Sequence, residues 1–282
     1  DSRARETETR EIGIHTVYRL VKGERFLRLS TTINNTVKDH VLRTVFPTNI
    51  QTDTVSAEVP FDVVERQIPL PDTRNWREPY KPVQPHQNFV DLSDGGNGFA
   101  LLNRGLPQYE AIDTPERPLA LTLLRANRAW NSVRLAHYPD QDGTQLQGEY
   151  TFEYAAMPHS GDWEAAGLTH QAELFNIESL SGAAGPGKGE LPLSLSFVEL
   201  KGKGLVLNAV KQGEWDSDAV VLRISNPGTS DVRGKLCLHA PFKQAELVNM
   251  METDTIKKLT ISRNSGISVT VPAKKVLTVK LY

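Results

Sequence analysis

The sequence is poor in cysteine, and this scarcity excludes two kinds of structure. Its 282 residues include one cysteine, Cys237. A single thiol forms no disulfide within the chain and cannot supply a zinc site built from several cysteines. The sequence also lacks any apolar run that approaches the ~18 residues of a membrane-spanning helix. We therefore expect neither a disulfide-stapled protein nor a membrane-spanning one.

An excess of basic charge is lacking as well. Lys and Arg number 32, Asp and Glu number 34, and the net charge is −2. Without a basic excess to bind a polyanion by counterion release, nucleic acid is disfavoured as a partner. Residues 1–11 are charged and lack the apolar segment of a signal peptide. The start at Asp1 suggests a piece cut from a longer protein, and 39% hydrophobic residues suffice for a globular core.

Short alternating apolar runs dominate what is present. Residues 14–20 and 25–33 alternate and flank a short connection with Gly23, a pattern typical of a β-hairpin. Similar runs of ~4–10 residues, bounded by Gly, Pro, Asn or Asp, recur along the chain. They predict further strands at residues 41–46, 99–102, 119–124, 148–156, 191–200, 205–210, 219–224, 235–239, 259–262, 267–271 and 277–281.

Two segments depart from this pattern, and one marks a boundary. Residues 163–174 have helical spacing with Asp162 as a candidate N-cap. Residues 64–85 contain five prolines and predict a long crossing loop. A boundary near residues 201–204 divides the chain into two all-β domains, residues 1–201 and 202–282, the second a small antiparallel sandwich.

Two motifs suggest binding sites, and each has a simpler explanation. Residues 182–188 have the G-x4-G-K spacing of a phosphate-binding loop, but Gly189 replaces the Ser or Thr that would bind Mg²⁺ and no parallel βαβ unit surrounds it. A flexible linker is favoured. His159 and Asp162 offer an imidazole and a carboxylate for a metal, whereas a capped turn before the helix explains them without one.

Several carboxylates and one arginine are further candidates for functional-site residues. A glycosidase needs two carboxylates that flank the scissile bond. Four acidic residues lie near one another in sequence, but a solvated strand edge is the favoured explanation for them: Asp53, Glu58, Asp62 and Glu65. Arg125 ends the apolar run 119–124, where an arginine is costly unless it is paired or directed into a cleft. The residues alone leave a salt bridge and a functional role both open.

An ordered set of segments resembles the C-terminal half of glycoside hydrolase family 38 α-mannosidases, above all those of the bacterial mannosylglycerate hydrolase type and the cytosolic type. The likeness covers most of residues 10–282, and the tail resembles that family's terminal β-sandwich. The segments are 46–47 with 52–53, 61–66, 88–94, 98–103, 119–126 and 152–159, followed by 207–211, 221–227 and 273–281.

This resemblance implies a β-supersandwich like that of galactose mutarotase, followed by a small sandwich. It implies retaining hydrolysis of α-mannosides, with mannosylglycerate or its 6-phosphate as candidate substrates, by an Asp nucleophile and a second carboxyl. The nucleophile and the ligands of a zinc ion belong to the family's N-terminal part, and nothing here matches them. The chain is thus expected to hold no catalytic or metal-binding residue, to need the missing catalytic and helical domains as partners, and to be cytoplasmic and bacterial. Self-association is left open.

The resemblance also favours one site residue. In the family, an arginine at the end of a supersandwich strand points into the sugar pocket, and residues 123–126 (LLRA) match that position, so Arg125 is the expected substrate-binding residue. Two alternatives stay open: a non-catalytic carbohydrate-binding module and a structural scaffold. Sugar-stacking candidates for the module are Trp76, Tyr80, Trp130 and Trp163, and cations for a phosphorylated substrate are Arg74, Arg77 and Lys81.

Overall fold

The computed structural model describes residues 8–78, 80–127, 142–183, 185, 187–262 and 266–282. Contacts divide the chain into two units, residues 1–57 with 65–176, and residues 58–64 with 177–282. Each unit is built mainly of antiparallel strands, so the expected all-β class is confirmed. The domain division expected at residue 202 stays a prediction.

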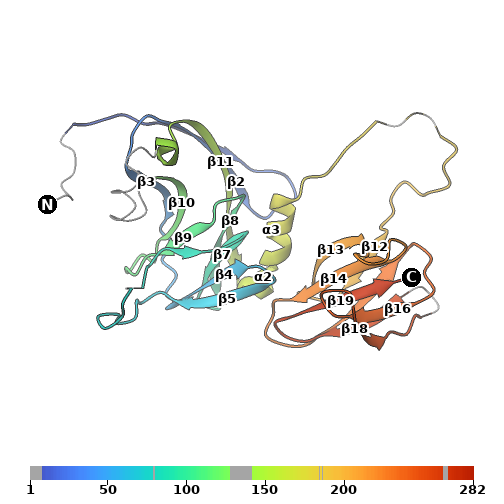
Figure 1. Cartoon of the computed structure of the whole chain (residues 1–282). Helices are drawn as coiled ribbons and strands as arrows, with labels where there is room; N and C mark the ends of the chain where they lie inside the picture. Colours follow the sequence, from blue (N-terminus) through green and yellow to red (C-terminus); the bar gives the residue numbers. More distant parts are fainter. Residues whose placement is uncertain (1–7, 79, 128–141, 184, 186, 263–265) are drawn as a thin grey trace. The chain divides into compact units, whose positions relative to one another are not determined.

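The first unit contains two sheets (Figure 1). In the seven-stranded sheet the spatial order is β1 (Gly13–Arg19), β2 (Leu27–Asn35), β11 (Gly148–Ser160), β8 (Asn97–Asn103), β7 (Phe89–Ser93), β4 (Thr54–Val59) and β5 (Asp62–Gln67). In the four-stranded sheet it is β3 (His40–Phe46), β10 (Leu119–Ala126), β9 (Gln108–Ala111) and β6 (Gln84–Pro85). A short 3-10 helix, η1 (Asp142–Gln145), precedes β11.

One apolar core fills the space between these two sheets. Alternate residues of most of the strands contribute to it, as period-2 alternation requires. Burying each large aliphatic side chain contributes about 1.5–3 kcal/mol. Its fully buried members include Ile33 and Leu101 from the larger sheet and Leu119, Leu121 and Tyr109 from the smaller one.

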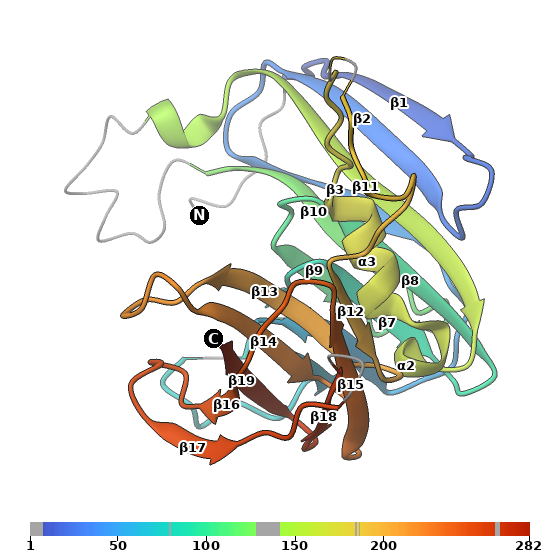
Figure 2. The same ribbon diagram turned by 90° about the vertical axis from the view of Figure 1, so that its right-hand side faces the viewer.

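Two short helices cover the other face of the larger sheet. Helix α2 (Trp163–Ala166) precedes α3 (Leu168–Asn176), which lies against β7 and β8 (Figure 2). The single helix expected over residues 163–174 is therefore interrupted. Gly167 adopts φ 68°, a left-handed conformation that ends α2 and that glycine adopts without strain. The expected cap is confirmed, because the Asp162 carboxylate accepts a hydrogen bond from the Ala165 amide at 2.7 Å.

A buried histidine–aspartate pair lies in the layer between the larger sheet and the helices. Nε2 of His159 on β11 is 2.8 Å from Oδ1 of Asp91 on β7, and both side chains are buried. Burial alone would lower the pKa of His159, but the hydrogen bond and charge of Asp91 outweigh it and raise the pKa. Gly98 on the strand between them leaves the space that the imidazole fills.

The second unit is a smaller sandwich of two sheets. One sheet has the order β12 (Val198–Lys201), β15 (Val232–Leu238) and β18 (Gly266–Val271). The other has the order β13 (Val206–Gln212), β14 (Val220–Asn226), β19 (Lys275–Leu281), β16 (Ala245–Val248) and β17 (Thr255–Lys258). Leu222, Ile224, Leu236, Ile267 and Val279 form its fully buried core.

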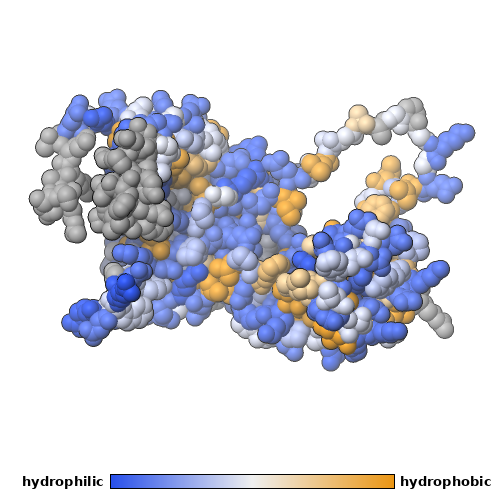
Figure 3. All heavy atoms as spheres, viewed as in Figure 1, coloured by the Kyte–Doolittle hydropathy of each residue, from blue (hydrophilic) through white to orange (hydrophobic). Residues whose placement is uncertain are grey.

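Three further sequence predictions differ from the structure. Residues 191–197 alternate like a strand but are not part of any strand, and apolar side chains along this segment are exposed (Figure 3). Residues 259–262 form only an isolated bridge, Ile261 with Ile267. The crossing loop begins after Gln67 rather than at residue 64, because β5 continues to that residue.

Gly98→Ala tests the packing around His159. The added Cβ would lie 2.0 Å from Cε1 of His159, so we expect the free energy of unfolding to fall by about 1–3 kcal/mol through overpacking. In a His159→Ala background the ring is gone, and the same substitution should cost less than about 0.5 kcal/mol. Urea unfolding of the four proteins of this cycle gives both numbers, and equal costs in the two backgrounds contradict the assignment.

Candidate functional site

The candidate site is the outer face of the four-stranded sheet, the face turned away from the core of the first unit. It is formed by residues of the three strands β3, β9 and β10. Residues that pair directly across antiparallel strands share a face, so the strand register identifies its members. They are Val41, Arg43 and Val45 on β3, Glu110 on β9, and Ala120, Thr122 and Arg125 on β10.

A β-bulge in β10 places Arg125 on this outer face. Thr122 pairs with Arg43, but the next pair along the strands is Leu124 with Leu42, so Leu123 is the extra residue. Leu121 and Leu123 both contact the core. Unbroken alternation would give residue 125 the same inward direction as these two leucines.

The bulge reverses that direction for the last part of β10. Leu124 pairs with Leu42, which packs against the core, and Arg125 pairs with Val41, which is 48% exposed. Bulges commonly redirect side chains next to active sites. The structure therefore places the guanidinium of a half-buried arginine on the exposed side of a sheet whose other side is apolar.

The rest of the outer face combines an ion pair with exposed apolar groups. Arg43 on β3 forms an ion pair with Glu110 on β9. These two strands flank β10, so the pair crosses it above Ala120 and Thr122, both of which are buried. Val45 is 47% exposed beside them. A face with fixed charges and exposed valines suits contact with another part of a protein.

None of the described sugar-stacking candidates belongs to this face. Trp163 packs against Phe89 with 6.4 Å between ring centroids, in the layer between the larger sheet and the helices. Trp76 is 57% exposed in the proline-rich loop. Trp130 lies outside the described residues. Tyr80 lines a slot with Arg66 and Tyr109 whose volume of about 10 Å³ is too small for a sugar.

Three of the acidic and cationic candidates, Asp53, Asp62 and Arg74, have local partners. Asp53 forms an ion pair with Arg117 at 2.8 Å, and Asp62 accepts a hydrogen bond from the Val63 amide. Arg74 forms an exposed ion pair with Asp72 in the proline-rich loop. Among residues 182–189, those that the structure describes form no helix or strand, so no helix N-terminus is present there to bind phosphate.

The described residues do not provide a metal site. His159, one of the two proposed ligands, hydrogen bonds to Asp91, and the other, Asp162, caps α2. Within the part of the chain that the structure describes, no group of three or more His, Cys, Asp or Glu side chains is placed to hold a metal ion. In the same part, no helix is long and apolar enough to cross a membrane.

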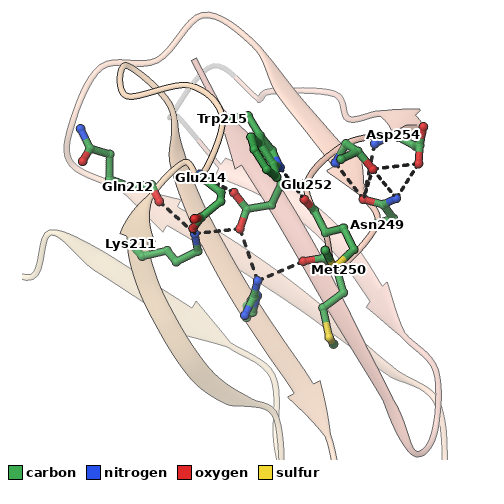
Figure 4. A network of polar contacts seen from close by, with 11 residues as sticks. Lys211, Gln212, Glu214, Trp215, Asn249, Met250, Glu252 and Asp254 are labelled. Atoms are coloured by element: carbon green, nitrogen blue, oxygen red, sulfur yellow. Dashed lines mark hydrogen bonds and ion pairs between the residues drawn. The ribbon is translucent and has the colours of Figure 1, made fainter.

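A second polar cluster, which the sequence did not reveal, centres on a buried carboxylate in the second unit. Glu252 forms ion pairs with Lys211 at 2.9 Å and with Arg223 at 3.3 Å. It also accepts a hydrogen bond from the Glu214 amide at 2.8 Å (Figure 4). Burial alone would raise the pKa of Glu252, but the Glu214 amide, Lys211 and Arg223 outweigh it and lower the pKa.

Comparisons with known families identify both units. Residues 4–140 match the family described as the glycosyl hydrolases family 38 C-terminal domain. Residues 204–279 match the glycosyl hydrolases family 38 C-terminal beta sandwich domain. The resemblance inferred from the ordered segments is confirmed by these two matches.

Individual relatives agree with this result. The chain is 29% identical over 224 residues to a Halalkalibacterium halodurans protein named "Putative mannosylglycerate hydrolase", covering 79% of this chain and 24% of that protein. It is 29% identical over 260 residues to human alpha-mannosidase 2C1, covering 91% and 23%. The crystal structure of an alpha-mannosidase from Enterococcus faecalis V583 has 27% identity and a TM-score of 0.82, covering 99% and 30%. The chain thus spans about a quarter of the length of these curated relatives.

Glu252→Gln tests the buried carboxylate through its pH dependence. A carboxyl with a lowered folded pKa stabilises the protein above its ordinary pKa of 4.5, and that stability is lost as the pH falls below this value. We expect the substitution to lower the free energy of unfolding by about 1–3 kcal/mol at pH 7. The difference should shrink as the pH falls from 4.5 to 3, as followed by urea unfolding with circular dichroism. A difference that is constant with pH contradicts the assignment.

Proposed function

Because the chain belongs to glycosyl hydrolase family 38, we propose that it is the C-terminal part of a longer α-mannosidase and that the outer face of its four-stranded sheet completes the sugar-binding pocket of that enzyme. The observation that supports this role is the bulge at Leu123, which turns Arg125 away from the apolar core. A strand that served only the core would gain nothing from this interruption of its pairing.

Arg125 would act as a fixed cation with directed donors. Its guanidinium carries five N–H groups in a rigid fork that matches sugar oxygens or a carboxylate. Such donors can orient the sugar hydroxyls and stabilise negative charge that develops on the departing oxygen in the transition state. The two carboxylates of a retaining mechanism would come from the part of the enzyme outside this chain.

A metal would also be held outside this chain. A zinc ion could fix the sugar ring and favour its distortion in the complete enzyme. The described residues offer no cluster to bind it, so the role of this chain toward the substrate rests on Arg125 and its neighbours on the outer face. Substrates proposed for the complete enzyme are α-mannosides, with mannosylglycerate or its 6-phosphate among them, and its proposed location is the cytoplasm.

Arg125→Ala in the longer enzyme tests this function directly. Loss of a charge-stabilising donor should lower kcat/KM for an aryl α-mannoside by about 100-fold. Arg125→Lys should recover only part of the loss, because Lys lacks the planar fork. Arg233→Ala, an exposed arginine on β15 of the second unit, is the matched control and should leave kcat/KM unchanged. Wild-type kinetics for Arg125→Ala would return this residue to a structural role.

The chain on its own gives a second test. Purified alone, it should not hydrolyse an aryl α-mannoside and should bind no stoichiometric zinc, because the proposal assigns the nucleophile and the metal ligands to the missing part. Turnover assays and metal analysis of the dialysed protein measure both. Measurable turnover contradicts the proposal, and saturable binding of mannosides to the chain alone favours the carbohydrate-binding module instead.

A further inference from the structure

Three large apolar side chains are exposed on two adjoining loops of the second unit. Trp215 is 67% exposed, Met250 is 48% exposed and Met251 is 66% exposed. They lie on two loops, residues 213–219 between β13 and β14 and residues 249–254 between β16 and β17. We call these three side chains the Trp–Met tip. Exposed apolar groups are ordinary when scattered, but a contiguous set commonly marks an interaction site.

Hydrogen bonds tie the two loops to each other. Nε1 of Trp215 donates to the carbonyl oxygen of Met251 at 2.9 Å, which fixes the indole against the second loop (Figure 4). Arg223 donates from Nη2 to the carbonyl oxygen of Met250 at 3.0 Å. The side chain of Glu252 binds the amide of Glu214, the residue before the tryptophan. The backbones of the two loops and the indole of Trp215 are therefore held in place without any partner.

The second loop is also rigid in itself. The Asn249 side chain accepts a hydrogen bond from the Thr253 amide at 3.0 Å, and its backbone amide donates to the Asp254 carbonyl at 3.0 Å. Glu252 adopts φ 63°, a left-handed conformation that costs free energy for a residue other than glycine. Such a conformation persists only where the surroundings over-determine it, as the contacts of Lys211 and Arg223 with Glu252 do here.

We propose that the Trp–Met tip is a docking surface for the part of the enzyme polypeptide outside this chain, into which Trp215 inserts as an apolar anchor. This inference rests on the proposed function, since it requires that longer polypeptide. The chain spans 20–24% of the length of its curated relatives, so most of such an enzyme lies outside it. Tryptophan is enriched among the residues that dominate binding at protein interfaces, and pre-ordering a surface reduces the entropy lost on association.

The chemistry of the tip favours a protein over a sugar. The indole has one hydrogen-bond donor, and Met251 already accepts from it. The two thioether side chains beside it are flexible and polarizable, and they fit irregular apolar recesses rather than the hydroxyls of a sugar. A recess lined with aliphatic or aromatic side chains is therefore the expected counterpart.

Hydrogen exchange of the backbone amides in the two loops tests the proposal. It is measured in the longer enzyme and in this chain alone. We expect exchange at least about tenfold slower in the longer enzyme, as burial at an interface requires. Trp215→Ala and Met251→Ser should each remove most of this extra protection. Trp76→Ala changes another exposed tryptophan, in the first unit; it is the matched control and should not change the protection.

Two features of the design keep the result interpretable. Met251→Ser retains the backbone carbonyl that accepts from Trp215, so it removes apolar surface while the loops stay tied. Both variants are also measured in the chain alone, where their thermal unfolding should match that of the wild type to within about 2 °C, as for other surface substitutions.

Three outcomes overturn the proposal. Equal exchange in the two proteins shows that nothing covers the tip. Protection that grows with the concentration of the chain alone identifies a second copy as the occupant. Protection that appears only with methyl α-mannoside identifies a sugar. Activity is measured separately: a longer enzyme that does not hydrolyse α-mannosides contradicts the proposed function, whereas the exchange data still decide whether the tip is covered.

Discussion

The alternation of β10 is the constraint on which the candidate site depends. This strand runs through the middle of the four-stranded sheet, and its leucines supply much of the core of the first unit. A strand of strict alternation would direct residue 125 into that core, where an unpaired guanidinium is costly. One extra residue, Leu123, solves this conflict within the same strand. The apolar part of β10 stays inside, while Arg125 reaches the face that carries Arg43 and Glu110.

Buried polar contacts play a similar organising part elsewhere. His159 and Asp91 connect β11 and β7 across Gly98, beneath the helices. Glu252 connects its loop to β13 through Lys211 and to β14 through Arg223, and it binds the loop between those strands through the Glu214 amide. Breaking a buried pair by removing one partner destabilises a protein strongly, because the remaining group stays buried without compensation. These clusters thus fix geometry in places where apolar packing alone would allow several arrangements.

Much of this could be predicted from the sequence, because period-2 alternation is a local signal. The hairpin of β1 and β2, the long strand β11 and the Asp162 cap all follow from it or from local capping chemistry. Arg125 was found from its position at the end of an apolar run and from the family resemblance. The bulge was not predicted, because pairing with β3 defines it. Residues 191–197 show the opposite case: they alternate, but they form no strand because no strand that the structure describes pairs with them. His159 and Asp91 are 68 positions apart in the sequence, and Glu252 and Glu214 are 38 positions apart. Neither contact therefore leaves a local pattern in the sequence.

The proposed function depends on where the Arg125 side chain lies in the complete enzyme. The most direct measurement is a crystal structure of that enzyme with a non-hydrolysable α-mannoside bound. The account predicts that the guanidinium of Arg125 lies within about 3 Å of a sugar oxygen or of a carboxylate that contacts the sugar. A structure in which the sugar is remote from Arg125 and from the outer face of the four-stranded sheet would contradict it.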